Sequence, residues 1–129
     1  MNDKKRILMV DDEVAFTALT KLNLERTGRY EVRAEREGAV AVQAAREFKP
    51  HLVLLDVVMP DVDGGQVLAE MRADAELQSI PVAFLTATVT KQATEERPEG
   101  IGGMPVIAKP VEPKQLMRQI ESILAQSPI

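Results

Sequence analysis

The chain of 129 residues contains no cysteine and no tryptophan, and it has only one histidine. Without cysteine, neither a disulfide framework nor a thiolate metal site is possible. One tyrosine and three phenylalanines leave little aromatic surface for stacking nucleic-acid bases. The formal net charge of −4 also argues against nucleic acid as a direct partner, because phosphate binding requires a basic face.

Long hydrophobic runs are also missing. No apolar run approaches the roughly 18 residues of a membrane span, and the start of the chain has too short an apolar run for a signal peptide. We therefore expect a cytoplasmic protein with no membrane partner. Hydrophobic residues make up 45% and charged residues 28% of the chain, which is ordinary for a globular protein. The length suits a single domain over residues 1–129.

Short apolar segments alternate with helix-like segments along the chain. Periodicity and turn residues predict strands over 4–10, 30–34, 52–56, 81–85 and 106–108. They predict helices over 14–26, 38–48 and 65–72, and a last helix that opens at Pro113. Between residues 88 and 97 the apolar stripe is poor, so a fourth helix there should be short or irregular. This alternation predicts a parallel sheet covered by helices on both faces.

Two of the predicted helices carry apolar residues at steps of three and four, which is typical of a core-facing stripe. In the first helix the residues expected to face the core are Val14, Ala15, Ala18, Leu19 and Leu22. In the last helix they are Leu116, Ile120, Ile123 and Leu124.

Polar residues stand at the end of several predicted strands. Asp11 and Asp12 follow the first strand, Asp56 ends the third, and Thr86 and Lys109 follow the last two. Taken alone, Asp56 fits a turn or helix-cap residue as well as it fits a site. Because the carboxyl ends of parallel strands share one edge of the sheet, where ligands of open α/β sheets bind, the whole set favours a site.

The residue types at this edge suggest a specific chemistry. Neighbouring carboxylates repel one another and raise each other's pKa values, so positive charge must compensate. Lys109 supplies one charge, and the remaining negative excess suits Mg²⁺, which prefers oxygen ligands. A cation, a lysine and a hydroxyl around a nucleophilic carboxylate are the equipment for phosphoryl transfer, with an aspartyl phosphate as a covalent outcome.

Four short motifs carry a resemblance to a known family. They are VDDE at 10–13, LLDVVMPDVDG at 54–64, FLTA at 84–87 and AKP at 108–110. In this order and spacing the chain resembles, over nearly its whole length, the receiver domain of two-component response regulators. The resemblance implies a flavodoxin-like, doubly wound (βα)5 fold with strand order 2-1-3-4-5. It also implies a stand-alone phosphoprotein that signals by protein contact or by onward transfer in a phosphorelay, not an enzyme with a catalytic domain.

The resemblance assigns roles to the acidic residues. Asp56 is the phosphoacceptor, and the donor is a histidine kinase or a histidine phosphotransfer protein. Asp12 binds Mg²⁺ directly and Asp11 supports it mainly through water. Asp56 and the backbone carbonyl of Val58 complete the protein ligands of the metal.

Four further positions follow from the same resemblance. Thr86 and Lys109 contact the phosphoryl group, Lys109 by pairing with Asp56 or its phosphate, and the small side chain of Ala87 leaves room for it. The Lys109–Pro110 peptide is expected to be cis, which proline tolerates.

The sequence departs from the family at two places. Receivers usually carry tyrosine or phenylalanine three residues before the lysine, where the ring reports phosphorylation, and this chain has Val106. We therefore expect signalling through ordering of residues 88–103 instead. At Val58 and Thr88 the chain lacks the polar side chain that often orients a hydrolytic water, which predicts slow self-dephosphorylation.

Three alternatives stay open. A degenerate receiver folds without being phosphorylated and acts as a binding module. A small Mg²⁺-dependent phosphatase of the haloacid dehalogenase kind requires an Asp-x-Asp pair and a cap region, whereas here Val57 and Val58 follow Asp56. The chain can also be a fragment of a larger hybrid kinase. The downstream target cannot be named from the sequence.

Overall fold

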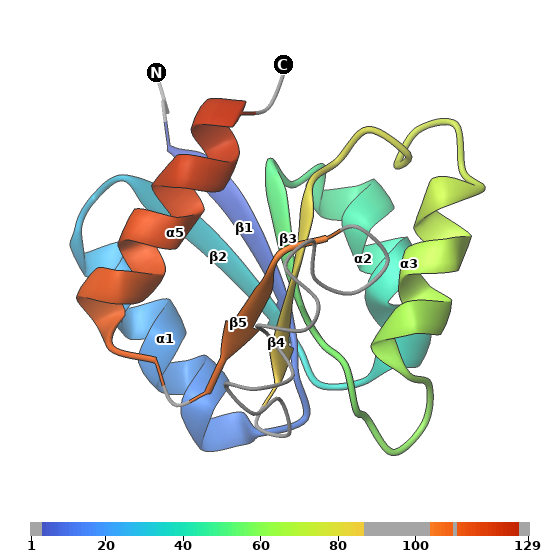
Figure 1. Ribbon diagram of the computed structural model, residues 1–129, viewed down its shortest axis with the longest axis horizontal. Coiled ribbons are helices and arrows are strands. Elements are labelled where there is room, and N and C mark those ends of the chain that lie inside the picture. Colours follow the sequence, from blue (N-terminus) through green and yellow to red (C-terminus); the bar gives the residue numbers. More distant parts are fainter. Residues whose placement is uncertain (1–3, 87–103, 110, 127–129) are drawn as a thin grey trace.

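The computed structural model describes residues 4–86, 104–109 and 111–126, and these form a sheet with helices on both faces (Figure 1). The five strands pair in parallel in the order β2-β1-β3-β4-β5, which confirms the expected flavodoxin-like topology. The strands are β1 (Lys5–Val10), β2 (Tyr30–Glu35), β3 (Leu52–Asp56), β4 (Val82–Thr86) and β5 (Val106–Ala108). Each predicted strand is therefore present, with ends that differ by at most one residue.

Two layers of helices enclose the sheet. The helices α1 (Val14–Arg26) and α5 (Pro113–Gln126) lie on one face, and α2 (Ala41–Phe48) and α3 (Gly64–Arg72) lie on the other (Figure 1). Successive side chains of a strand point to opposite faces. In β1, accordingly, Ile7 and Met9 join the core beneath α1 and α5, whereas Leu8 and Val10 join the core beneath α2 and α3.

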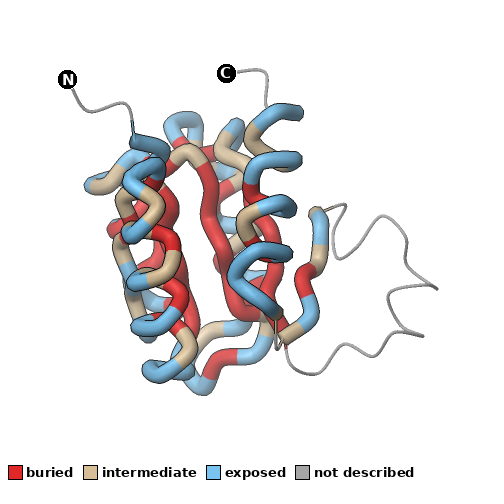
Figure 2. The backbone as a smooth tube through the Cα atoms, turned by 90° about the vertical axis from the view of Figure 1, so that its left-hand side faces the viewer, coloured by how far each residue is buried: buried red, intermediate tan, exposed pale blue. Residues whose placement is uncertain are grey.

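The central strands are buried on both faces, as their uninterrupted apolar sequence predicts. Residues 7–10 of β1 and 52–55 of β3 have no exposed surface. Figure 2 shows these buried strands running between helices whose outer sides are exposed. The rim formed by the carboxyl ends of these strands therefore stands on a rigid base.

Two helix starts differ slightly from expectation. The predicted helix over 38–48 begins as a short 3-10 turn, η1 (Gly38–Val40), before α2. Helix α3 begins at Gly64, because the side chain of Asp63 accepts a hydrogen bond from the backbone N–H of Gln66 at 2.8 Å and caps the helix.

The core-facing side of α1 was predicted wrongly. Its buried residues are Thr17, Thr20 and Leu24. Val14, Leu19 and Leu22 of the expected stripe are 50%, 59% and 53% exposed, and Ala15 and Ala18 are exposed as well. Burial costs Thr17 no hydrogen bond, because its hydroxyl donates to the carbonyl oxygen of Val14 at 3.0 Å.

The last helix follows the expectation. Leu116 and Ile120 of α5 are buried, and Ile123 and Leu124 are partly buried against the same core. The possible fourth helix at 88–97, the segment 88–103, Ala87 and the Pro110 peptide lie outside the described residues. Within the described part of the chain, no helix combines the length and hydropathy that a membrane span requires.

Candidate functional site

The ends of β1 and β3 bring three carboxylates together. The two strands pair directly, with Val10 opposite Leu55, so that Asp11 and Asp56 emerge side by side. Carboxylate oxygens of Asp11, Asp12 and Asp56 all lie within 4.8 Å of one another. Asp11 is fully buried and Asp56 is only 6% exposed, while Asp12 faces the solvent. The structure thus brings together the three predicted acidic residues.

The environment of Asp56 disfavours its charged form. Burial and the nearby charge of Asp11 raise the pKa of the Asp56 carboxyl from 3.8 to about 6, although Lys109 and the backbone N–H of Val58 act in the opposite direction. That N–H donates to Oδ1 of Asp56 at 3.3 Å. A bound cation would relieve the repulsion between these neighbouring carboxylates.

Lys109 reaches the rim from the end of β5. Its Nζ lies 2.7 Å from Oδ2 of Asp11 and 3.1 Å from Oε1 of Glu13. Among the described residues its ion pairs are with these two acids and not with Asp56, so the expected contact with Asp56 is absent from this structure. Burial opposes the lysine charge, but the hydrogen bonds to Asp11 and Glu13 raise its pKa above the usual value.

Thr86 completes the rim on the other side of β3. Strand β4 pairs with β3, with Leu85 opposite Asp56, and Thr86 ends β4 with 1% of its surface exposed. Its position next to the acidic cluster agrees with the predicted placement. Its predicted contact with a phosphoryl group stays a prediction.

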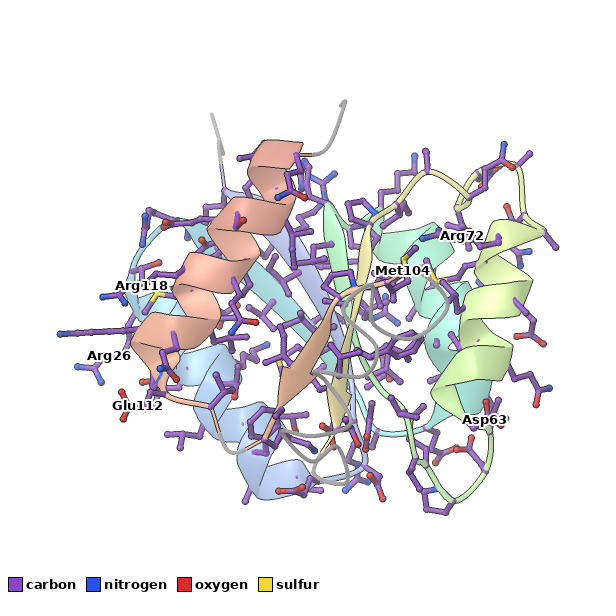
Figure 3. The ribbon with its side chains drawn as sticks, in the orientation of Figure 1. Arg26, Asp63, Arg72, Met104, Glu112 and Arg118 are labelled. Carbon is purple, nitrogen blue, oxygen red and sulfur yellow. The ribbon has the colours of Figure 1, made fainter. Side chains whose placement is uncertain are left out.

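The loop after Asp56 is hydrogen-bonded to η1, and its end packs closely against the backbone of Asp56. The Asp61 carboxylate accepts hydrogen bonds from the backbone N–H groups of Gly38 at 3.2 Å and Ala39 at 2.9 Å, and this joins the loop to η1. At Gly64 a Cβ atom would lie only 2.5 Å from the carbonyl oxygen of Asp56. Figure 3 shows Asp63 at the start of α3, at the end of the sheet opposite to Arg72 and Met104.

Sequence reasoning missed three contributors to this site, namely Glu13, Phe16 and Asp61. The carboxylate of Glu13 pairs with Lys109, and the carboxylate of Asp61 accepts hydrogen bonds from the backbone of η1. Phe16 lies on α1 with its ring 4.8 Å from Nζ of Lys109. The only signal available was that Glu13 and Phe16 follow the Asp pair closely.

Val106 occupies the position where receivers usually carry an aromatic residue. It is partly buried, pairs with Phe84 across β4 and β5, and packs against the core beneath α2 and α3. Val58, two residues after Asp56, is 59% exposed. Neither side chain supplies a polar group to the rim.

Comparisons with known proteins agree with this geometry. The family model of the response regulator receiver domain matches residues 7–121. The protein PilH of Pseudomonas aeruginosa is 37% identical, over 93% of this chain and 98% of its own length. The structure of a putative response regulator from Chloroflexus aurantiacus superimposes with a TM-score of 0.82 at 30% identity, over 95% of this chain and 99% of that one.

Other relatives are longer than this chain. The alkaline phosphatase synthesis transcriptional regulatory protein PhoP of Bacillus subtilis is 34% identical over 97% of this chain but only 50% of its own length. The chain thus spans about half the length of the first curated relatives that it matches.

The open parallel sheet with acidic residues and a lysine at one rim fits the receiver class of signalling modules. The chain belongs to the response regulator receiver family of two-component signalling. Receivers of this family interact with histidine kinases and with downstream targets.

Proposed function

We propose that this protein accepts a phosphoryl group on Asp56 from a phosphohistidine of a kinase or phosphotransfer protein, and that it signals by protein contact or by onward transfer. The observation that carries the proposal is the convergence of Asp56 with Asp11, Asp12 and Lys109 at one rim. A single receiver domain over residues 1–129 and a cytoplasmic location are parts of the same proposal.

In the transfer, an oxygen of the Asp56 carboxylate forms a bond to phosphorus. The phosphorus–nitrogen bond of the donor breaks, and its electron pair remains on the imidazole nitrogen. Transfer leaves negative charge on the phosphoryl oxygens, so groups that bind these oxygens accelerate the reaction. Lys109 and the Thr86 hydroxyl are the described residues that we assign to this role, and Ala87 would leave space beside them.

The donor set fits a hard divalent cation. The carboxylates of Asp11, Asp12 and Asp56 offer oxygen ligands within 4.8 Å of one another, and Mg²⁺ favours such ligands while keeping several waters. We assign Mg²⁺ to Asp12 and Asp56, with the carbonyl of Val58 as a third ligand and Asp11 acting mainly through water. When bound, the ion neutralises charge on the carboxylate and on the phosphoryl oxygens.

The exposed side of α1 suggests where the phosphodonor docks. Val14, Ala18 and Leu22, which we call the α1 stripe, are spaced four residues apart on this helix and are exposed. The helix begins two residues after Asp12, so a protein that delivers phosphoryl groups to Asp56 has to approach beside it. An apolar stripe next to the site suits contact with an apolar surface of the donor.

Incubation with acetyl phosphate and Mg²⁺, followed by intact mass measurement, tests the central assignment. The wild type should gain one phosphoryl group, Asp56→Asn should gain none, and omission of Mg²⁺ should prevent labelling. Asp63→Asn is the matched control, because asparagine also caps helices and Asp63 lies outside the cluster. Equal labelling of Asp56→Asn and wild type, or no labelling of wild type, would contradict the proposal. The alternative of a phosphorylation-independent binding module would then be favoured.

The two modes of output differ in what happens next. In a relay, labelled phosphate leaves Asp56 for a second histidine protein. In a contact mechanism, the label stays while the affinity for a partner changes. With no polar side chain at Val58, we expect the label to persist for minutes or longer, and a lifetime of seconds would contradict this expectation.

A further inference from the structure

Lys109 is held at the rim by side chains from a different part of the chain. Its own side chain is only 6% exposed, and the carboxylates of Asp11 and Glu13 bind its ammonium group. The ring of Phe16 faces the same ammonium group, with 4.8 Å between Nζ and the ring centroid. All three partners belong to residues 11–16, between the end of β1 and the first turns of α1.

The aromatic ring contributes something that the two carboxylates do not. A carboxylate that binds an ammonium group competes directly with a phosphoryl oxygen for its N–H donors. The face of an aromatic ring attracts the cation without accepting a directional hydrogen bond. Phe16 therefore helps to hold the ammonium group of Lys109 at the rim without occupying any of its N–H donors.

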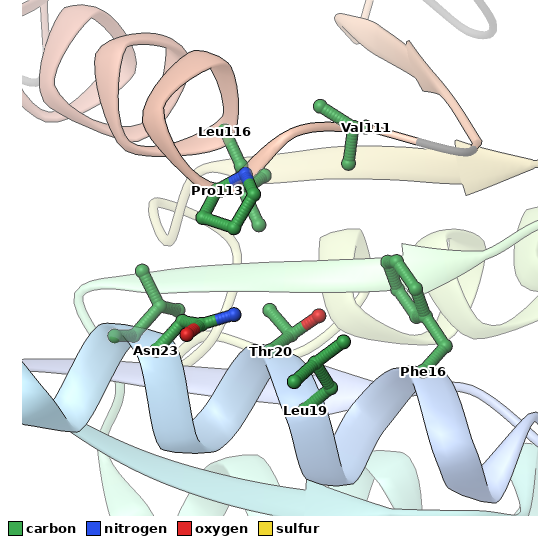
Figure 4. A pocket seen from close by; sticks show the side chains of 8 residues that line it. Phe16, Leu19, Thr20, Asn23, Val111, Pro113 and Leu116 are labelled. Atoms are coloured by element: carbon green, nitrogen blue, oxygen red, sulfur yellow. The ribbon is translucent and has the colours of Figure 1, made fainter.

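Phe16 also lines a pocket with the segment that follows Lys109. Its ring lines a pocket between α1 and α5, together with Val111, Pro113 and Leu116 from the chain after β5 (Figure 4). The ring is partly buried against the core beneath these two helices. The same side chain thus lies next to the lysine head group and lines a pocket with the segment that follows the lysine.

We propose that Phe16 is a positioning residue for phosphoryl transfer, because its ring helps to hold the Lys109 ammonium group at the rim that Asp11 and Asp56 share. The proposal rests on the proposed function of Asp56. An ammonium group that is already oriented at the rim loses less conformational freedom when the phosphoryl group arrives. Its contribution to the rate of phosphoryl transfer is therefore larger. Removing the ring should leave the fold and the acidic cluster in place and weaken only this orientation.

Two substitutions at Phe16 separate the ring from its bulk. Phe16→Leu keeps an apolar side chain but removes the aromatic face, whereas Phe16→Tyr keeps the face. With acetyl phosphate and Mg²⁺ as the probe, we expect Phe16→Leu to be labelled about three- to tenfold more slowly than wild type. Phe16→Tyr should be labelled at nearly the wild-type rate. Leu19→Ala is the matched control, because Leu19 lines the same pocket without a contact to Lys109.

A second measurement distinguishes positioning from a general loss of structure. In the wild type the Phe16 ring should shift the NMR resonances of the Lys109 ε-methylene protons upfield. Phe16→Leu should lose this shift, and Phe16→Tyr and Leu19→Ala should retain it. The inference would be overturned if Phe16→Leu were labelled at the wild-type rate, or if Leu19→Ala slowed labelling as much as Phe16→Leu does. Absence of labelling in the wild type would instead overturn the assignment of Asp56, while the Lys109 shift would still report on Phe16.

Discussion

Helices α1 and α5 cover the same face of the sheet (Figure 1), but they differ in how far they bury their apolar residues. Helix α5 buries Leu116 and Ile120, as its periodicity predicts. Helix α1 buries Thr17 and Thr20 beside Leu24 and leaves Leu19 and Leu22 more than half exposed, at 59% and 53%. Two neighbouring helices in one layer therefore differ in which kinds of residue they bury.

The difference shows which helix serves the fold alone. The stability of a helix on a sheet comes from its buried apolar face, and α5 supplies that face in full. Helix α1 meets the sheet with two threonines and Leu24, and its exposed apolar residues have no role in the core. We infer that the exposed apolar residues of α1 contact a partner, whereas the exposed residues of α5 face solvent. Three of the experiments below test this contrast, and one tests the acidic rim beside α1.

The largest effect should separate two leucines. Leu116→Ala removes a side chain that is 2% exposed in α5, and it should lower the free energy of unfolding by about 2–4 kcal/mol. Leu22→Ala removes the same atoms from a residue that is 53% exposed in α1, and it should change stability by less than about 0.5 kcal/mol. Urea unfolding measures both. Equal costs would show that α1 packs through Leu22 in solution.

The acidic rim beside α1 should make the folding stability depend on pH. The pKa of Asp56 is raised to about 6 in the folded chain, against 3.8 as the ordinary value, mainly by burial. In the unfolded chain Asp56 loses its proton first, so folding stability from this group is present at low pH and is lost as the pH rises from about 4 to about 6. Without Mg²⁺, Asp56→Asn should therefore be about 1–2 kcal/mol more stable than wild type at pH 7.5.

Urea unfolding across pH provides the internal control for this prediction. The advantage of Asp56→Asn should shrink below about pH 5 and vanish near pH 3, because both proteins are then neutral at this position. Added Mg²⁺ should stabilise wild type more than the variant. An advantage that does not change with pH would mean that the asparagine acts through packing.

A charge on the α1 stripe should affect transfer from a protein donor. Leu22→Lys should lower the ratio of the labelling rate from a phosphorylated histidine protein to the labelling rate from acetyl phosphate by about tenfold, which corresponds to about 1.4 kcal/mol. Gln119→Lys places the same charge on an exposed position of α5 and is the control. An equal decrease for both variants would mean that the donor does not distinguish the two helices.

The smallest effect should come from a buried threonine of α1. Thr17→Val keeps the shape of the side chain but removes the hydroxyl that donates to the Val14 carbonyl. Loss of one hydrogen bond is partly offset by burial of an extra methyl group, so stability should change by less than about 1 kcal/mol. A larger loss in urea unfolding would show that the hydroxyl itself, rather than the shape of threonine, selects the inner face of α1.

The strands and the acidic site could be predicted from the sequence because both depend on strong local signals. Apolar runs that end on Asp56 or Thr86 fix where strands stop, and parallel strands bring their ends together. The inner face of α1 could not be predicted, because threonine and leucine compete for it and only the fit to the sheet decides. The partners of Lys109 and Asp61 were equally hidden, since both contacts join distant parts of the chain.

The close contact at Gly64 limits how this chain can evolve. Even an alanine would place its Cβ 2.5 Å from the carbonyl oxygen of Asp56 and 3.0 Å from the Cα of Val57. A mutation at position 64 would therefore displace the backbone of Asp56, the proposed phosphoacceptor, although the glycine carries no chemistry of its own. Among variants of this protein, position 64 should tolerate replacement as poorly as Asp56 does, and for a purely geometric reason.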